Sequence, residues 1–137
     1  MKKSVSLFIA AIMLTSMMLN VSALNIDNGD TVSPCWEYMS GVTVNLSFYD
    51  TGGLATASIS RIKGVTTSLE GTLTVYEKVG SRWVEVDSAS DSSTRTLSIS
   101  LNFDAESGKT YKAEVEVTAY GADGSESDSN SKTKTCP

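Results

Sequence analysis

The sequence predicts an all-β protein, an antiparallel sandwich of seven short strands. Apolar and polar residues alternate with period two along most of the chain, and no stretch shows the apolar spacing of an amphipathic helix. Turns rich in glycine and aspartate separate the alternating segments at regular intervals. The 137 residues are enough for one domain with a single core of modest size.

The first 23 residues have the composition of a secretory signal peptide. They begin with Met-Lys-Lys, continue with a largely apolar run, and reach the small residues Val-Ser-Ala at 21–23. We therefore expect cleavage after Ala23, a polar leader over residues 24–34, a β-sandwich domain over residues 35–137, and a secreted, extracellular protein. A retained transmembrane helix fits less well, because a span needs about 20 apolar residues and this run has about 15.

Composition narrows the range of functions. Cleavage would remove two of the 11 basic residues and none of the 16 acidic ones, which leaves a net charge of −7. This charge argues against nucleic acid, anionic lipid and other polyanions, so we expect a monomer with no nucleic-acid partner and no membrane partner after cleavage. The chain contains no histidine, which excludes Ser-His and Cys-His nucleophiles and histidine-ligated zinc. We expect no catalytic residue, cofactor or metal.

Alternation places the first two strands around residues 42–48 and 55–59, with a bulge or strand end near Ser60 and a loop over 64–67. Later strands are expected over 97–103 and 111–119. The side chains expected to face the core are Val42, Val44, Leu46, Phe48, Ala55, Ala57, Ile59, Leu97, Ile99, Leu101, Phe103, Tyr111, Ala113, Val115, Val117 and Ala119. Residues 126–135 have almost nothing apolar to bury, so they predict either a charged edge strand or a partly disordered tail.

Residues 69–79 and 82–90 predict a β-hairpin joined at Gly80-Ser81, followed by a polar loop over 87–93. A two-residue loop with glycine first suits a type II′ turn. Pairing of Val79 with Arg82 would set Lys78 opposite Trp83 and Val75 opposite Val86. In this register the core face carries Leu73, Val75, Val84 and Val86, and the other face carries Thr74, Tyr76, Lys78, Trp83 and Glu85.

Seven short strands with this spacing are typical of an immunoglobulin-like sandwich. Residues 71–78 (GTLTVYEK) with 83–86 (WVEV) resemble strands C and C′ of a fibronectin type III domain, and 108–115 (GKTYKAEV) with 119–122 (AYGA) resemble its strand F and the following turn. The resemblance covers about residues 40–131, implies a fibronectin type III-like fold, and gives Tyr111 the tyrosine-corner position. The tryptophan usual in strand B has no counterpart here. The whole chain is also similar to small uncharacterised exported proteins of Gram-positive bacteria, a likeness that implies no activity.

Cys35 and Cys136 are the only cysteines, and in an exported protein they predict a disulfide. An intramolecular bond closing about 100 residues would contribute on the order of 4 to 5 kcal/mol; two free thiols or an intermolecular bridge are the alternatives. An odd number of strands places the two ends at opposite poles, roughly 25 to 30 Å apart, whereas a disulfide tolerates about 7 Å between Cα atoms. Either residues 36–40 or the C-terminal tail must therefore run back along the sandwich, and we expect the first, with a bend at Gly41.

Three groups of carboxylates are candidates for metal binding or catalysis. The calcium candidates are Asp123, Glu126 and Asp128 in one loop and Asp27 with Asp30 near the N-terminus. Neither group matches an EF-hand loop, so solvated turn carboxylates are the favoured interpretation. Glu114 and Glu116 lie on one strand face at a spacing of about 7 Å, which resembles a glycosidase pair, but a solvated face beside Lys112 explains them better.

Exposed aromatic residues supply the remaining functional hypothesis. Tyr76 and Trp83 would be diagonal neighbours on the outer hairpin face and, with Lys78, form a surface able to stack on a sugar or anchor a protein. The structural alternative is that Lys78 packs over the Trp83 ring and the ring covers the hairpin. We expect a non-enzymatic interaction module for a protein or glycan at the cell surface. The alternatives are a carbohydrate- or cell-wall-binding module and, with no supporting residues, a secreted hydrolase or toxin.

Overall fold

The computed structural model describes residues 36–137, so the predicted signal peptide, the predicted polar leader and Cys35 lie outside the described residues. Within that range the chain forms seven strands and no helix that is long and apolar enough to cross a membrane. The strands are β1 (Met39–Tyr49), β2 (Gly52–Arg61), β3 (Thr66–Val79), β4 (Arg82–Ser93), β5 (Leu97–Phe103), β6 (Thr110–Gly121) and β7 (Ser125–Thr135).

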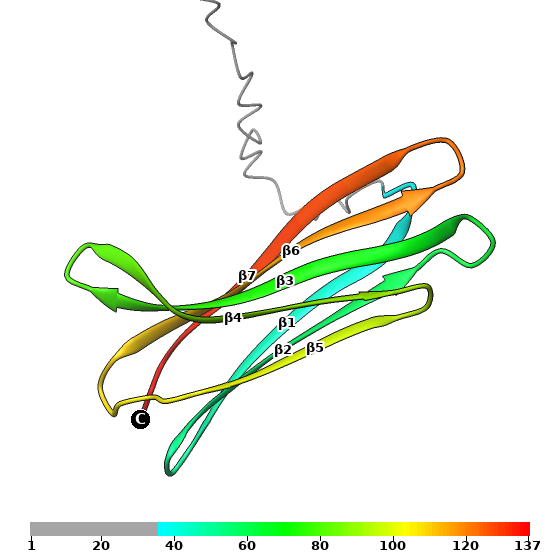
Figure 1. The fold of residues 1–137 in the computed structure, drawn as a ribbon. Helices are drawn as coiled ribbons and strands as arrows, with labels where there is room; N and C mark the ends of the chain where they lie inside the picture. The colour runs from blue at the N-terminus through cyan, green and yellow to red at the C-terminus, as the bar shows by residue number, and fades with distance from the viewer. Residues whose placement is uncertain (1–35) are drawn as a thin grey trace, which may run out of the picture. The chain divides into compact units, whose positions relative to one another are not determined.

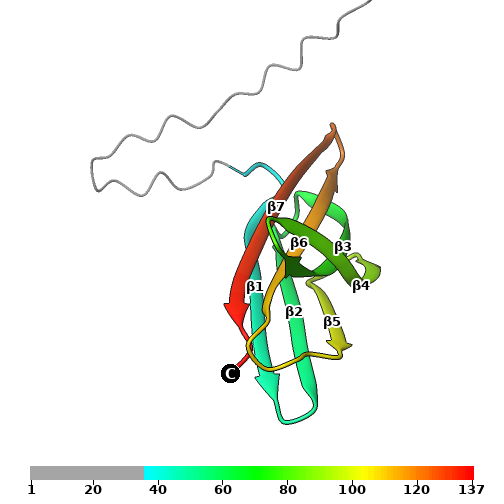
Figure 2. The same cartoon turned by 90° about the vertical axis from the view of Figure 1, so that its left-hand side faces the viewer.

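The strands form two antiparallel sheets that face each other (Figure 1). One sheet has the order β1-β2-β5 and the other has the order β4-β3-β6-β7. Figure 2 shows β7 of the larger sheet beside β1 of the smaller one. These observations confirm the prediction of an all-β, antiparallel, seven-stranded architecture.

The core lies between the sheets and is built from the alternate apolar residues of the strands. Every side chain predicted to face inward on β2, β5 and β6 is buried, as are Val42, Val44 and Leu46 on β1. Phe48 is half-buried and completes an aromatic cluster with Phe103 and Tyr111, in which ring centroids lie 5.3 to 6.3 Å apart. Full burial of one such side chain contributes roughly 1.5 to 3 kcal/mol, so the alternation accounts for most of the fold's stabilisation.

Two predicted loops are wrong because polar residues in them pair as strand. β3 begins at Thr66, inside the loop expected over 64–67, and the buried Thr66 hydroxyl accepts a hydrogen bond from the Ile62 amide at 2.9 Å and donates one to the Tyr38 carbonyl. β4 continues to Ser93 and pairs with β3 as far as Leu69. β4 is an edge strand, so its polar side chains remain in water while its backbone is paired.

The β3–β4 hairpin has the predicted turn but not the predicted register throughout. Val79 pairs with Arg82 and Lys78 with Trp83. Gly80, the first residue of the turn, has φ of +64°, whereas none of the described non-glycine residues, Ser81 included, has a positive φ. A type II′ turn needs a positive φ only at its first central residue and a type I′ turn needs one at both, so this turn is of type II′. Further along, a bulge leaves Val75 opposite Asp87, whereas the prediction set it opposite Val86.

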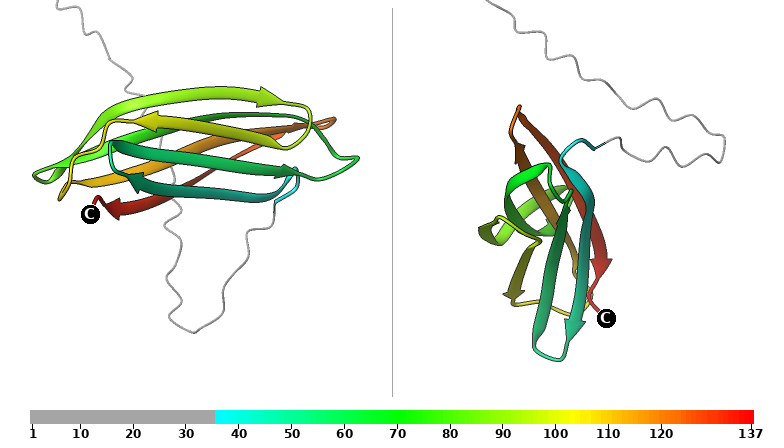
Figure 3. Two further views of the ribbon diagram at one scale, coloured as in Figure 1. Left: turned by 90° about the horizontal axis from the view of Figure 1, so that it is seen from below. Right: turned by 90° about the vertical axis from the view of Figure 1, so that its right-hand side faces the viewer.

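The prediction that Val84 and Val86 belong to the core is also wrong: their exposed fractions are 48% and 39%. Val84 pairs with Glu77 and so keeps the inward-facing side of the hairpin. However, β5 ends at Phe103, which lines one small cavity together with Val86 and Asp87. Beyond that point the hairpin extends past the neighbouring turns, as its far-left end in Figure 3 (left) shows, and no strand lies beneath it.

The last segment is an edge strand, which resolves the alternatives for residues 126–135. β7 pairs with β6 in unbroken register from Thr110↔Thr135 to Tyr120↔Ser125. The start of the described chain does not bend back at Gly41, contrary to expectation. β1 runs from Met39 through Gly41 with only a register shift between them, and Met39 is itself buried in the core.

The burial difference between two valines of the hairpin gives a test of this register. Val75→Ala should lower the free energy of unfolding by roughly 1 to 3 kcal/mol, because it leaves a cavity in the core. The same truncation at the exposed Val86 should stay within about 0.5 kcal/mol. Urea denaturation of both variants measures the difference, and equal losses would show that the bulge is misplaced.

Candidate functional site

The inward-facing side of β7 carries polar residues where a core strand would carry apolar ones. The carboxylate of Glu126 accepts hydrogen bonds from three consecutive backbone amides, those of Glu37 at 2.9 Å and of Tyr38 and Met39 at 2.8 Å. Successive amides around one anion form a favourable binding concavity for negative charge. Glu126 therefore fixes the entry of the chain into β1.

Two further side chains of β7 extend this contact along β1. Asp128 accepts a hydrogen bond from the indole nitrogen of Trp36 at 2.9 Å, and the Asn130 amide donates one to the Val42 carbonyl at 2.8 Å. β1 and β7 belong to different sheets and share no backbone ladder. Side chains of β7 thus supply the hydrogen bonds that join these two edges of the sandwich.

This use of Glu126 and Asp128 bears on the calcium candidates. Both carboxylates are occupied by protein donors, and residues 36–137 contain no group of three or more acidic or cysteine side chains placed to hold a metal ion. Asp27 and Asp30 lie outside the described residues. Of the other pair considered, Glu114 forms an ion pair with Lys112 at 3.1 Å, and Glu116 is exposed on the outer sheet face.

Cys136 lies at the opposite pole from Trp36. Its backbone is fixed by two hydrogen bonds, from its amide to the Lys109 carbonyl at 2.8 Å and from the Gly108 amide to its carbonyl at 2.9 Å. Its side chain is buried. The predicted bond to Cys35 stays a prediction, because Cys35 is not among the described residues. Asp128, which binds the Trp36 indole, lies eight residues before Cys136, a distance of about 26 Å at the rise of a strand. Cys35 is the neighbour of Trp36 in the chain, so it cannot reach Cys136 while Trp36 is bound to Asp128. An intramolecular disulfide therefore requires this hydrogen bond to break.

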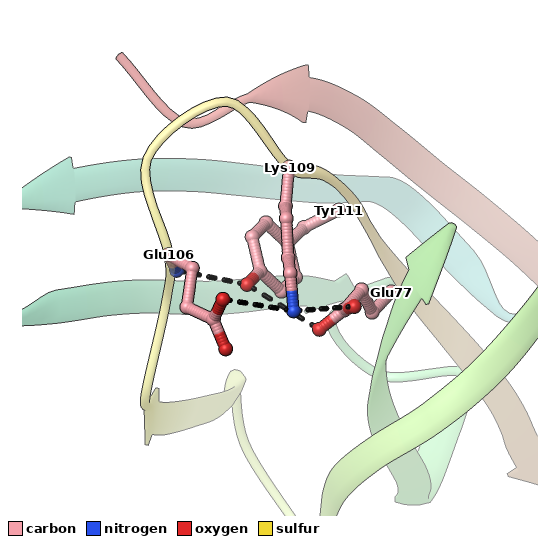
Figure 4. A network of polar contacts seen from close by, with 4 residues as sticks. All are labelled: Glu77, Glu106, Lys109 and Tyr111. Carbon is pink, nitrogen blue, oxygen red and sulfur yellow. Dashed lines mark hydrogen bonds and ion pairs between the residues drawn. The ribbon is translucent and has the colours of Figure 1, made fainter. Parts of the chain in front are cut away.

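A polar network supports the base of the hairpin from its inward-facing side (Figure 4). Lys109 forms ion pairs at 3.0 Å with Glu77 and with Glu106, and hydrogen bonds to these carboxylates raise the pKa of Lys109 to about 12. The Tyr111 hydroxyl accepts a hydrogen bond from the Glu106 amide at 2.9 Å and donates a long one to Glu77 at 3.5 Å. Burial raises the pKa of Tyr111. The network ties β3 to the β5–β6 connection.

Tyr76 and Trp83 are neighbours on the outer face, as predicted, but the lysine beside them is not the predicted Lys78. The ammonium group of Lys112, on β6, lies 4.8 Å from the ring centroid of Tyr76 and 5.3 Å from that of Trp83. Attraction between a cation and a ring face stabilises such an arrangement. The expectation that Lys78 covers Trp83 assigned this place to the wrong lysine, since Lys78 is exposed beside the turn.

Exposed apolar side chains concentrate on the same hairpin. Among the described residues six large apolar side chains are exposed, and four of them belong to β3 and β4, namely Val79, Trp83, Val84 and Val86. Sequence reasoning identified Trp83 but placed two of the valines in the core. The available signal was Ser88, a polar residue at the position where the alternation of Val84 and Val86 would require the next apolar one.

The outer face of the larger sheet contains a shallow groove of about 990 Å³. It crosses β4, β3, β6 and β7, and the outward side chains that line it are hydroxyl groups and the carboxylates of Glu70 and Glu116. Cross-strand hydroxyl pairs order this surface: Thr72 with Ser90 at 2.7 Å and Thr118 with Ser127 at 2.8 Å. No basic side chain lines the groove. Such a surface offers hydrogen bonds to a polar or cationic ligand.

Comparison of the sequence with protein-family models and with curated proteins finds no match to either.

The Glu126 contact can be tested by replacing the carboxylate with an amide of the same shape. Glu126→Gln should lower the free energy of unfolding by about 2 kcal/mol, because a hydrogen bond to a charged group contributes about 1.5 to 3 kcal/mol and the new amide nitrogen faces backbone donors. Glu116→Gln, on an exposed outer position of β6, is the matched control and should change stability by less than about 0.5 kcal/mol. Similar losses in both variants, measured by urea denaturation, would contradict the structural role of Glu126.

The position of Trp36 gives a test of the disulfide. In reduced protein Asp128→Ala should cost about 1 to 2 kcal/mol of unfolding free energy, since the indole loses a charged acceptor. In protein shown by mass spectrometry of unreduced peptides to carry an intramolecular Cys35–Cys136 bond, the same substitution should cost nothing, because the two contacts exclude each other. A loss of equal size in both forms would refute this exclusion.

Proposed function

We propose that this chain is a secreted, monomeric, non-enzymatic interaction module that acts at the cell surface through its β3–β4 hairpin. The observation that carries the proposal is the gathering of four of six exposed large apolar side chains on this hairpin. Contiguous exposed apolar surface on a small soluble domain marks an interaction site more often than chance. The signal peptide predicted from the N-terminal residues supports the extracellular location.

We further propose that the sandwich is of the fibronectin type III kind. The strand orders β1-β2-β5 and β4-β3-β6-β7 correspond to the A-B-E and C′-C-F-G orders that the sequence resemblance implies. The hydrogen bond from the Glu106 amide to the Tyr111 hydroxyl, five residues downstream, supports the tyrosine-corner role. In such a fold the hairpin formed by β3 and β4 corresponds to strands C and C′.

The proposed contact surface predicts which exposed valine matters. Val84→Ser should reduce retention of the mature protein on washed cells of its source organism at least fivefold, because it places a hydroxyl group at the centre of the exposed apolar surface. Val65→Ser is the matched control, since Val65 is similarly exposed (43% against 48%) but lies in the β2–β3 loop at the other pole, and it should have no effect. Equal retention of the two variants would refute the proposal.

A carbohydrate- or cell-wall-binding module is the second candidate, favoured by the hydroxyl- and carboxylate-lined groove with Tyr76 and Trp83 near its end. In that case insoluble peptidoglycan should retain the protein, and Glu116→Ala in the groove should abolish retention while Glu85→Ala on β4 leaves it unchanged. Pull-down with both variants distinguishes the candidates, since the hairpin proposal expects retention on cells to survive Glu116→Ala.

A further inference from the structure

The turn of the hairpin differs in charge from the rest of the molecule. We call residues 78–84 the hairpin tip. It contains Lys78 and Arg82 and no acidic residue, whereas the whole chain has a formal net charge of −5. Both cations are exposed, and the ion pairs formed within the described residues use Lys109 and Lys112 instead. Two positive charges therefore stand free at the end of an otherwise acidic domain.

The same seven residues expose apolar surface on both sides of the hairpin. Val79 and Val84 lie on the inward-facing side, with exposed fractions of 53% and 48%, and Trp83 lies on the outer side. Acidic residues stand further back, at Glu77 and Glu85, and Glu77 is already paired with Lys109. The tip thus combines unpaired cations, aliphatic side chains and a tryptophan at the convex end of a projecting hairpin (Figure 3).

This combination selects among the surfaces an extracellular module can meet. Lysine is depleted in protein interfaces although arginine and tryptophan are enriched there, so the tip fits such an interface only in part, and an anionic wall polymer offers the valines nothing apolar to contact. The boundary between lipid headgroups and acyl chains accepts all three features, because tryptophan prefers that depth, apolar side chains enter the acyl region, and anionic headgroups attract lysine and arginine. We propose, resting on the hairpin as the contact surface, that the tip inserts into the surface of a bilayer containing anionic lipids.

The remaining charges set the orientation of the bound molecule. Asp50, Asp87 and Asp104 lie in or beside the β1–β2 turn, β4 and the end of β5, at the same pole as the tip. An anionic surface repels them, so contact is limited to the tip, with the long axis of the sandwich directed away from the bilayer. The negative net charge of the whole chain predicted no membrane partner, but the hairpin tip is positively charged and differs locally from the rest of the molecule.

The test is sedimentation of the mature protein with vesicles, at low and at physiological salt. One set of vesicles is phosphatidylcholine alone, and the other contains 30 mol% phosphatidylglycerol in phosphatidylcholine. Binding is expected only to the anionic vesicles and should weaken with salt. The double variant Lys78→Gln, Arg82→Gln should bind about 30-fold more weakly, since each basic residue near an anionic surface contributes roughly a factor of five. The matched control, Lys63→Gln with Arg95→Gln, removes the same charge at the other pole and should bind like the parent.

A second measurement reports insertion directly. In a Trp36→Phe background Trp83 is the only tryptophan, and anionic vesicles should shift its emission to the blue; Val79→Ser with Val84→Ser should reduce both the shift and the binding. Equal binding by the tip and control charge variants, or unchanged Trp83 emission on bound protein, would overturn the proposal. Loss of cell retention in Val84→Ser without any vesicle binding would overturn the lipid assignment and leave the hairpin as the contact surface. Retention abolished by protease treatment of the cells would assign a protein partner instead.

Discussion

The carboxylate of Glu126 holds together the two edges of the sandwich that no backbone ladder joins. It accepts hydrogen bonds from three consecutive backbone amides and so fixes where the chain enters β1. Asp128 and Asn130 add hydrogen bonds to Trp36 and to the Val42 carbonyl. Within β1 these side chains satisfy the Met39 amide and the Val42 carbonyl, backbone groups that would otherwise face water or other chains. The closure also separates the poles: Trp36 is held at one and Cys136 at the other.

Alternation of apolar and polar residues was sufficient to predict the strands and the core face of β1, β2, β5 and β6, because each of these strands is covered by the opposite sheet along its apolar beat. The same alternation misplaced Val84 and Val86. It specifies which side of a strand a residue occupies but not where the opposing sheet ends, and β5 stops at Phe103. The bulge that leaves Val75 opposite Asp87 depends on pairing between distant residues, which a local pattern does not contain.

β7 shows the opposite limitation. Its sequence offers no apolar face, so a tail and an edge strand were equally consistent with it, and the roles of Glu126 and Asp128 depend on residues nearly ninety positions earlier in the chain. Tyr76 and Trp83 were predictable as outer neighbours from hairpin register alone. The cation between them was not, because Lys112 comes from β6, whose place beside β3 is a property of the sheet order.

The hairpin is anchored at its base on both sides, and at its end only Trp83 has a partner. Lys112 lies over Tyr76 and reaches Trp83 on the outer side, while Lys109 and Tyr111 hold Glu77 on the other. Folding gains little from apolar side chains left in water, since burial is what makes them stabilising. A rigid base that presents valines, a tryptophan and two unpaired cations is therefore not explained by the stability of the domain. Departures of this kind from local folding rules are expected where a protein makes contact with something else.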